Sequence, residues 1–411
     1  MPSAEIHREN LQSVFDAALA RVNGRTCVRR YLEAHPNSDP VYVIAVGKPA
    51  PAMAWGVIDA LDEKIADALI ITKHGHGESM PWPCLTAAHP VPDAASLAAG
   101  DALLKFVSKI PDDVCVLVLL AGGASALVER LPKGVTLEQW QAVNDWVLGA
   151  GLDIHACNYI RKRISLIKGG RLAQRLAPRN VLCLILSDVP DNDMGTVGSG
   201  PLAPDSHPGG TPSFIASAPK FVRDLIERAP SAPAANDPAF ANVKTVIVAT
   251  LEDAKQAAAK AARQKGYLVS VERQFITGDA VTVGRELGER LRNEEPGTFR
   301  IWGGETQVTL PENPGRGGRS QSLALSAALA LRGQQGVLLL AAGTDGTDGP
   351  TEEAGAVVDG GTVERGVAAG RDAGRALERA DAGSFLEATG DLVRTGPTGT
   401  NVTDLILGLK Y

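Results

Sequence analysis

Runs of apolar residues, rich in valine, leucine and isoleucine, recur along the first three-fifths of the chain. The runs at 41–46, 114–120, 181–186 and 243–249 predict buried strands, and each is followed by a glycine-rich or polar segment. A strand that is covered on both faces loses the alternation of apolar and polar residues, so its sequence becomes one continuous apolar run. Helical stretches lie between the runs, and this alternation of strand and helix predicts an α/β fold with a parallel sheet.

The pattern changes at residues 229–238, which are rich in proline and alanine. Proline fixes the backbone and removes an amide donor, so this segment is predicted to be an exposed connector between two domains. A chain of 411 residues is also too long for one ordinary core. The expected domains are residues 1–236 and 240–411, and the strand 243–249 would open the second. Further strands are expected there at 268–271, 299–302, 307–310, 337–342 and 405–409.

Composition and charge exclude several classes of protein. The formal net charge is −6 and there is no polybasic arm, so nucleic acid is not expected as a partner. No apolar run reaches membrane-spanning length, and the N-terminus lacks the apolar region of a signal peptide. The five cysteines are odd in number and widely spaced, so neither a disulfide framework nor a zinc site is indicated. A cytoplasmic protein with no membrane partner is therefore expected.

Candidate chemistry gathers where the predicted strands end, because open α/β sheets bind ligands in the crevice at the carboxyl ends of their strands. Lys48 follows the first run, Asp188 follows the third, and Gly122, Gly123 and Ser125 follow the second. Paired glycines and a serine at the start of a helix are a good layout for binding an anion. A solvated turn lysine and a plain helix cap are the alternatives for Lys48 and Ser125. A hydrolase nucleophile is disfavoured, because no glycine stands two residues after Ser125.

The segment 315–325 is rich in glycine and basic residues and precedes a predicted helix. Its glycines would let the backbone approach an anion closely. Ser320 is expected to cap the helix, with the first helical amides directed at a ligand. Arg319 stands just before the helix, where its guanidinium could clamp a phosphoryl group or a carboxylate. Arg316 is expected to lie in solvent. The alternative is a flexible, solvated basic loop.

Short segments throughout the chain resemble, in order, those of the class II glycerate 2-kinases, the MOFRL-domain type often named hydroxypyruvate reductase. They are 46–50, 72–77, 89–93, 120–127, 167–172, 187–189, 199–201, 303–306, 317–321, 343–349 and 395–401. No single segment is specific, but the ordered set is, and it spans nearly the whole chain.

The resemblance implies an α/β enzyme of two domains with its active site in the cleft between them. The N-terminal domain would be a Rossmann-like parallel sheet with helices on both faces, and the smaller C-terminal domain would be of the MOFRL type. Such an enzyme transfers the γ-phosphoryl group of ATP to the 2-hydroxyl of D-glycerate, giving 2-phospho-D-glycerate and ADP, with Mg²⁺ or another divalent cation. A monomer or a homodimer is expected.

The family's catalytic lysine, arginine and aspartate fall on Lys48, Arg319 and Asp188. The chemistry of the residues agrees, because phosphoryl transfer requires positioning and positive charge more than covalent work. Asp188 could orient or deprotonate the 2-hydroxyl, or bind metal through water. The remaining expected contacts are a phosphate or substrate at Gly122, Gly123 and Ser125, and the nucleotide at Gly304, Glu305, Thr344, Asp345, Thr398 and Asn401.

Asp193 is a candidate metal ligand. The loop Asp191-Asn192-Asp193 departs from the Gly-Asp-Asp that relatives more often show, and Asn192 in place of an aspartate removes one negative charge.

Two other functions fit part of the pattern. An NAD(P)H-dependent hydroxypyruvate reductase would require Gly-x-Gly-x-x-Gly between a strand and a helix, and none of the four strand ends is followed by it. A non-catalytic nucleotide-binding relative would not require Lys48, Arg319 and Asp188 together. The P-loop and the protein-kinase signatures are absent from the sequence, so the nucleotide site is expected to be of another kind.

Overall fold

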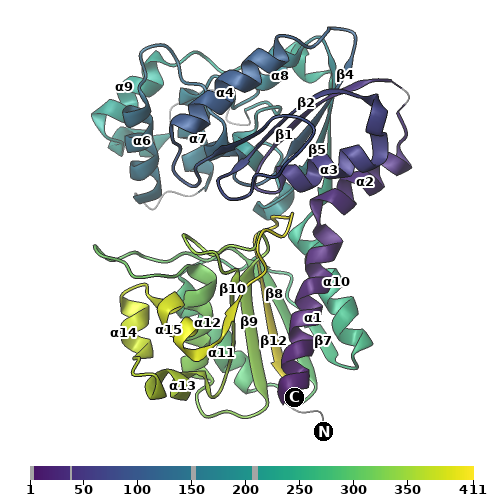
Figure 1. Cartoon of the computed structure of the whole chain (residues 1–411). Coiled ribbons are helices and arrows are strands. Elements are labelled where there is room, and N and C mark those ends of the chain that lie inside the picture. Colours follow the sequence, from purple (N-terminus) through teal and green to yellow (C-terminus); the bar gives the residue numbers. More distant parts are fainter. Residues whose placement is uncertain (1–3, 38, 150–153, 206–211) are drawn as a thin grey trace. The chain divides into compact units, whose positions relative to one another are not determined.

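The computed structural model describes residues 4–37, 39–149, 154–205 and 212–411 (Figure 1). The chain divides into two compact units. One consists of residues 24–249 and is called the inserted unit here; the other combines residues 1–23 with residues 250–411 and is called the terminal unit. Both units are layered α/β structures, each built on its own sheet.

Six parallel strands form the sheet of the inserted unit, in the order β3-β2-β1-β4-β5-β6. Their bounds are β1 Val41–Val46, β2 Ile65–Lys73, β3 Cys84–Ala87, β4 Cys115–Leu120, β5 Asn180–Leu186 and β6 Val243–Ala249. This is the strand order of doubly wound dinucleotide-binding folds. The continuous apolar runs of the sequence are the inner strands, so the predicted Rossmann-like parallel sheet is confirmed.

Helices cover both faces of this sheet (Figure 1). The helices of this unit are α2 Gly24–Ala34, α3 Ala50–Leu61, α4 Ala94–Val107, α5 Ala124–Leu127, α6 Leu137–Gly149, α7 Ile154–Ile164, α8 Arg171–Leu176 and α9 Lys220–Arg228. Of these, α6, α7 and α9 pack against one another in a separate apolar cluster around Trp140, Ile160 and Val222. Ile44 of β1 belongs to one core cluster with Leu103 of α4 and Leu172 of α8. The alternate residue Val43 faces the opposite side, where α3 packs on β1, β2 and β4. Short 3₁₀ turns complete the unit at Asp62–Lys64, Pro190–Asn192, Val197–Ser199, Ser213–Ser217 and Pro238–Phe240.

The terminal unit contains a mixed sheet in the order β11-β10-β9-β12-β8-β7. Its strands are β7 Leu268–Val271, β8 Thr298–Gly304, β9 Val337–Gly343, β10 Gly355–Asp359, β11 Leu392–Val393 and β12 Asp404–Lys410. β7 and β8 are parallel, and every other neighbouring pair is antiparallel. β12 therefore runs against both β8 and β9, so its first residue lies level with their last residues.

The helices of the terminal unit also pack on both faces of its sheet (Figure 1). They are α1 Ala4–Val22, α10 Leu251–Gln264, α11 Ala280–Arg292, α12 Arg319–Ala330, α13 Thr362–Ala368, α14 Ala373–Glu378 and α15 Ala382–Thr389. α11 and α12 pack against the sheet around Trp302, with Leu287 and Leu323 in the same cluster. α1 and α10 pack together and contact β12.

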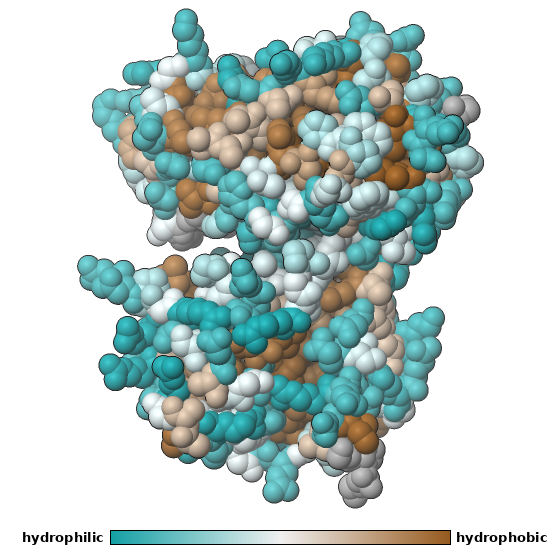
Figure 2. Space-filling model, viewed as in Figure 1, coloured by the Kyte–Doolittle hydropathy of each residue, from teal (hydrophilic) through white to brown (hydrophobic). Residues whose placement is uncertain are grey.

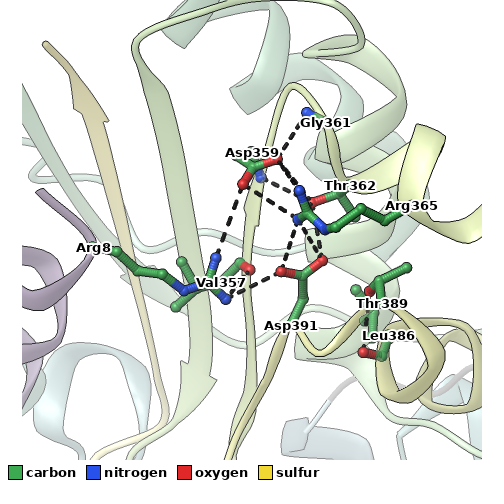
Figure 3. Close-up of polar contacts among 9 residues, drawn as sticks. All are labelled: Arg8, Val357, Asp359, Gly361, Thr362, Arg365, Leu386, Thr389 and Asp391. Carbon is green, nitrogen blue, oxygen red and sulfur yellow. Dashed lines mark hydrogen bonds and ion pairs between the residues drawn. The ribbon is translucent and has the colours of Figure 1, made fainter. Parts of the chain in front are cut away.

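Polar contacts also tie α1 to the far edge of the same sheet (Figure 3). Arg8 donates to Asp391 Oδ1 and to the Val357 carbonyl, each over 3.1 Å. Asp391 is buried and also accepts from Arg365 Nη2 at 2.9 Å on both oxygens, while Asp359 binds the same arginine. The N-terminal helix is therefore an integral part of the terminal unit.

The structure corrects the expected division of the chain. The strand 243–249 was expected to open the second domain, but it is β6, which pairs with β5 along its length and completes the first sheet. The proline-rich segment 229–238 is mostly exposed, as expected, yet it lies within the inserted unit. Arg171 Nη2 donates to the Pro230 carbonyl at 2.6 Å and anchors this segment to α8. Proline content indicated irregular backbone correctly, but it carried no information on which sheet the next strand would join.

One predicted strand is also wrong. Residues 307–310 form no strand; Gln307 makes an isolated bridge with Asp279, Val308 is half-buried, and Thr309 and Leu310 are exposed. In the part of the chain that the structure describes, no helix is both long and apolar enough to cross a membrane. Hydrophilic and hydrophobic residues are interspersed on the face shown in Figure 2, and single exposed apolar side chains are ordinary on a protein surface.

Candidate active site

The first group of candidate residues lies at the switch point of the inserted unit's sheet. β1 and β4 are neighbours in the middle of the strand order, where the connections turn to opposite edges of the sheet. Ligands of doubly wound folds bind at such a point, beyond the carboxyl ends of the strands. Val46 pairs with Leu120, so the two strands end level. Lys48 follows one end, and Gly122 and Gly123 follow the other.

Backbone hydrogen bonds fix the position of Lys48 between three strands. Its amide donates to the Gly122 carbonyl at 3.0 Å, and its carbonyl accepts from Thr72 Oγ1 at 2.9 Å. Gly123 has φ +88°, and a Cβ there would lie 3.1 Å from Lys48 Cγ and 3.3 Å from His89 Cδ2. Glycine at this position therefore lets the loop lie against both side chains. His89 was not among the candidate site residues, although the segment 89–93 belonged to the resemblance.

Ser125 is half-buried and leads into a chain of buried hydroxyl and amide groups. Its Oγ lies 2.8 Å from Ser199 Oγ, which donates to Asn158 Oδ1 at 2.7 Å. Ser199 has φ +61°, a strained conformation for a residue other than glycine. The cap position of α5 is occupied by Gly123, so Ser125 is not the plain helix cap that was the alternative. Ser199 and Asn158 were missed, because only the fold brings them to Ser125.

The two acidic candidates of this unit follow β5. Asp188 comes just after the strand's last residues, and the preceding amide, of Ser187, donates to the Ala249 carbonyl at 3.0 Å. The carboxylate of Asp193 accepts from the Gly195 amide at 2.9 Å and from Thr196 Oγ1 at 2.7 Å. Asp193 thus organises its own turn. Among the described residues, no group of three or more His, Cys, Asp or Glu side chains is arranged to hold a metal ion.

The second group of candidates lies at one edge of the terminal unit's sheet. Asp404, the first residue of β12, pairs with Gly304 at the end of β8 and with Gly343 at the end of β9. Glu305 follows β8, and Thr344 and Asp345 follow β9, so the antiparallel register brings these expected nucleotide contacts around Asp404. Thr398 donates to the Thr344 carbonyl at 2.5 Å, which adds the segment 395–401 to the same edge.

The segment 395–401 is also attached to the N-terminal helix α1. Asn23 donates to the Thr398 carbonyl at 3.0 Å, and Thr400 Oγ1 donates to the Val22 carbonyl at 2.7 Å. Asn401, the other expected nucleotide contact, is buried. The end of α1 therefore supports the loop that carries Thr398 and Asn401.

Arg319 is the cationic centre of this edge. It is the first residue of α12, and its guanidinium contacts the Asp404 carboxylate through Nε at 2.7 Å and Nη2 at 3.0 Å. Nη1 contacts Glu305 Oε1. Burial would lower the pKa of Arg319, but the charges of Asp404 and Glu305 outweigh it and raise the pKa well above its usual value. Arg319 is therefore permanently charged.

Asp348 corrects the expected anion site at the start of this helix. The amides of Ser320 and Gln321 donate to its carboxylate, at 3.1 and 2.7 Å, so the first helical amides already have an internal partner. Gly318 is the cap residue, and Ser320 lies inside the helix. A Cβ on Gly318 would lie 2.3 Å from Asp348 Cγ, so the glycine admits the aspartate and not a ligand. Burial, together with the charge of Asp404, raises the pKa of Asp348 to about 7.

Arg316 is likewise not the solvated residue that was expected. Its Nη2 lies 2.6 Å from Glu353 Oε1 and its Nη1 lies 2.7 Å from Glu387 Oε2. The Glu353 side chain is buried, so this arginine compensates a buried charge. The segment 315–321 is therefore a fixed loop that leads into the first turn of α12, held by acidic partners on two sides, and not a flexible basic loop.

Comparison with known proteins places this geometry in a family. Residues 10–225 match the domain of unknown function DUF4147, and residues 298–404 match the MOFRL family. The chain is 37% identical to D-glycerate 2-kinase of Thermotoga maritima over 91% of both chains. It is 33% identical to glycerate 2-kinase of Pyrococcus horikoshii over 90% of this chain and 87% of the other.

The chain belongs to the class II glycerate 2-kinase family. The crystal structure of glycerate kinase from Thermotoga maritima matches with a TM-score of 0.82 at 34% identity, covering 99% of this chain and 100% of that chain. Agrobacterium vitis has a relative named putative hydroxypyruvate reductase, 34% identical over 97% of this chain and 93% of its own. The resemblance found in the short segments is thus confirmed, and the same family includes both names.

Proposed function

We propose that this protein is a kinase that transfers the γ-phosphoryl group of ATP to the 2-hydroxyl of D-glycerate, giving 2-phospho-D-glycerate and ADP. Membership of the glycerate 2-kinase family carries this proposal, since the D-glycerate 2-kinase of Thermotoga maritima matches over nine-tenths of both chains. The residues at the two sheet edges have the chemistry that phosphoryl transfer requires, namely fixed positive charge and a dense set of hydrogen-bond donors.

Lys48 and Arg319 are the proposed catalytic cations. Lys48 would place a point charge against the substrate carboxylate or a phosphate, with the amides of the segment 122–125 beside it. Arg319 would supply a planar pair of donors to the phosphoryl group in transit, a geometry that suits three equatorial oxygens better than a lysine does. Asp188 is the proposed partner of the 2-hydroxyl, either orienting it or accepting its proton.

The nucleotide is proposed to bind at the edge formed by the ends of β8 and β9 and the start of β12. Gly304, Glu305, Thr344 and Asp345 lie at that edge, with Thr398 and Asn401 on the adjoining segment. Mg²⁺ would arrive as part of the MgATP substrate, held by phosphate oxygens and water, as is usual for this ion. Since Asp193 already organises its own turn, it would contribute at most one further oxygen.

A direct test measures ADP formed from ATP and D-glycerate, with the product assayed in two ways. Enolase alone consumes 2-phosphoglycerate, whereas 3-phosphoglycerate reacts only when phosphoglycerate mutase is added. The expected result is full signal with enolase alone. Signal that appears only with the mutase would show that the product is 3-phosphoglycerate, and it would overturn the proposed transfer to the 2-hydroxyl. Consumption of NADH or NADPH with hydroxypyruvate, without ADP formation, would support the reductase named among the relatives.

A further inference from the structure

The two carboxylates that hold Arg319 differ in burial and in geometry. The Asp404 side chain is 8% exposed and contacts the guanidinium at two points, whereas the Glu305 side chain is 47% exposed and contacts it at one. We propose that Asp404 is the permanent positioning residue of Arg319, and that Glu305 is an internal anion that the phosphoryl group of the substrate displaces. The proposal rests on the proposed function, because it takes Arg319 as the residue that binds that group.

The two carboxylates contact different N–H donors of the guanidinium. Arginine has five N–H donors in one plane. Asp404 engages Nε and Nη2, which are the donors of one edge. The second edge, between Nη1 and Nη2, is where a phosphoryl group would form paired hydrogen bonds. Glu305 contacts Nη1, at one end of that second edge, so its negative charge competes with any anion that approaches there.

The backbone explains why one carboxylate stays and the other leaves. Asp404 stands at the start of β12 between Gly304 and Gly343, and turning it away would leave a buried charge without a cation. Glu305 has a fixed backbone, since its amide donates to the Ile276 carbonyl at 2.8 Å, but its long side chain is half exposed. A half-exposed ion pair contributes little stability, so Glu305 can turn into solvent at small cost.

The charge of the whole edge favours this exchange. Burial raises the pKa of the Asp404 carboxyl against the opposing effect of Arg319, and like-charge repulsion from Glu305 and Asp345 adds to this rise. Asp348 adds a further carboxylate beside the same arginine. A phosphoryl group would therefore meet repulsion as well as attraction at Arg319. When the Glu305 side chain turns into solvent, the nearest exposed negative charge that repels the phosphoryl group is removed.

The first experiment measures anion binding by the full chain, with inorganic pyrophosphate as the probe in isothermal titration calorimetry. Glu305→Gln keeps the shape of the side chain and removes its charge, so pyrophosphate should bind about 3- to 10-fold tighter. Glu387→Gln is the matched control, because Glu387 is an exposed partner of Arg316 in the same unit and should leave binding unchanged. Unchanged or weaker binding by Glu305→Gln, or no binding by the parent chain, overturns the displacement proposal.

The second experiment tests positioning by Asp404. Asp404→Asn should lower kcat about 100-fold or more with KM for ATP changed far less, because a misplaced guanidinium affects the transition state most. Asp404→Glu should recover part of the loss. Asp391→Asn removes a comparably buried carboxylate that binds Arg365 (Figure 3), and it should lower the melting temperature while kcat per folded molecule is retained.

If Asp404→Asn and Asp391→Asn changed kcat per folded molecule equally, Asp404 would have only a structural role and would not position Arg319 for catalysis. Failure of the proposed function has a different signature, namely no ADP from the parent chain with ATP and D-glycerate. In that case the pyrophosphate titration still decides whether Glu305 competes with an anion at Arg319.

Discussion

Arg316 and Arg319 stand three residues apart in one glycine-rich loop, and their partners give them different roles. Arg316 joins a buried and an exposed glutamate, as a structural ion pair does. Arg319 is fixed along one edge by Asp404 and directs its other edge to Glu305. The sequence marked both as basic residues near a helix start. Only the fold distinguishes them, because Asp404 and Glu353 come from distant segments.

Arg319→Lys is expected to lose most of the activity that Arg319→Ala loses. Lysine keeps the charge, but it cannot form the two-point contact with Asp404 or present a planar pair of donors. We expect kcat to fall about 10³-fold or more in both variants, in line with arginines that stabilise phosphoryl transfer elsewhere. Steady-state kinetics checks this. Arg332→Ala, which removes an exposed pair with Glu364, should stay near parental activity.

Lys48→Ala should abolish most turnover while the melting temperature changes little. The backbone of Lys48 carries the contacts with Gly122 and Thr72, and these survive loss of the side chain. Activity and thermal unfolding are measured on the same preparations. A parallel loss of folding and activity would mean that the side chain supports the loop at Gly123 and not a substrate.

At the scale of elements, the buried strands were predictable, and the assignment of strands to sheets was not. The inner strands were evident as apolar runs, whereas the cap of α12 was expected at Ser320 and is Gly318. β10 was missed because its five residues lie among glycines and acidic residues and resemble a loop. β6 was found but placed in the wrong sheet. Periodicity reports local burial, whereas the choice of neighbour depends on the whole fold.

The start of α12 should make stability depend on pH through Asp348. Its pKa is raised from 3.8 to about 7 in the folded state, so between pH 4 and 7 the folded chain retains a proton that the unfolded chain loses. The folded state then binds more protons, and its stability falls as pH rises across this window, by up to about 1.4 kcal/mol per pH unit. Asp348→Asn cannot titrate there, so the parental stability relative to this variant should decline from pH 4 to 7 and level off above 7.

Urea unfolding of the parental chain and of the Asp348→Asn variant at several pH values measures this difference in the free energy of unfolding. A difference that stays constant between pH 4 and 7 would contradict this prediction, because it would show that Asp348 ionises at or below its usual pKa in the folded state, held by the amides of Ser320 and Gln321.

A second element-scale prediction concerns the buried pair of Lys168 and Glu129, which joins the start of α8 to the segment after α5. Lys168 Nζ contacts Glu129 and the Val128 carbonyl, and Ser165 donates to Glu129 Oε1 at 2.6 Å. Lys168→Met should destabilise the chain by about 3–5 kcal/mol, because it leaves a buried carboxylate without a cation. The double variant Lys168→Met, Glu129→Gln should recover part of that loss in urea unfolding.

At the scale of the whole molecule, the terminal unit should require both ends of the chain. The apolar face of α1, including Leu11, Val14, Phe15 and Ala18, is fully buried, and α1 packs along α10. Residues 250–411 produced alone should therefore expose this surface and aggregate or unfold. Adding residues 1–23 through a flexible linker should restore a cooperative unfolding transition. A stable, monomeric 250–411 would show that α1 is dispensable.

The same interrupted path of the chain has a consequence for biosynthesis. α1 leaves the ribosome before the inserted unit, yet its partners begin at Thr250, after the whole inserted unit of residues 24–249. At roughly 5–20 residues per second, the nascent helix waits on the order of 10 to 45 seconds with its apolar face uncovered. The inserted unit can fold during that interval, since its strands are contiguous in the chain. Synthesis thus imposes an order in which α1 is made before the inserted unit but reaches its packing partners only after it. During that wait, a chaperone that covers short apolar helices would have its clearest substrate in residues 4–22.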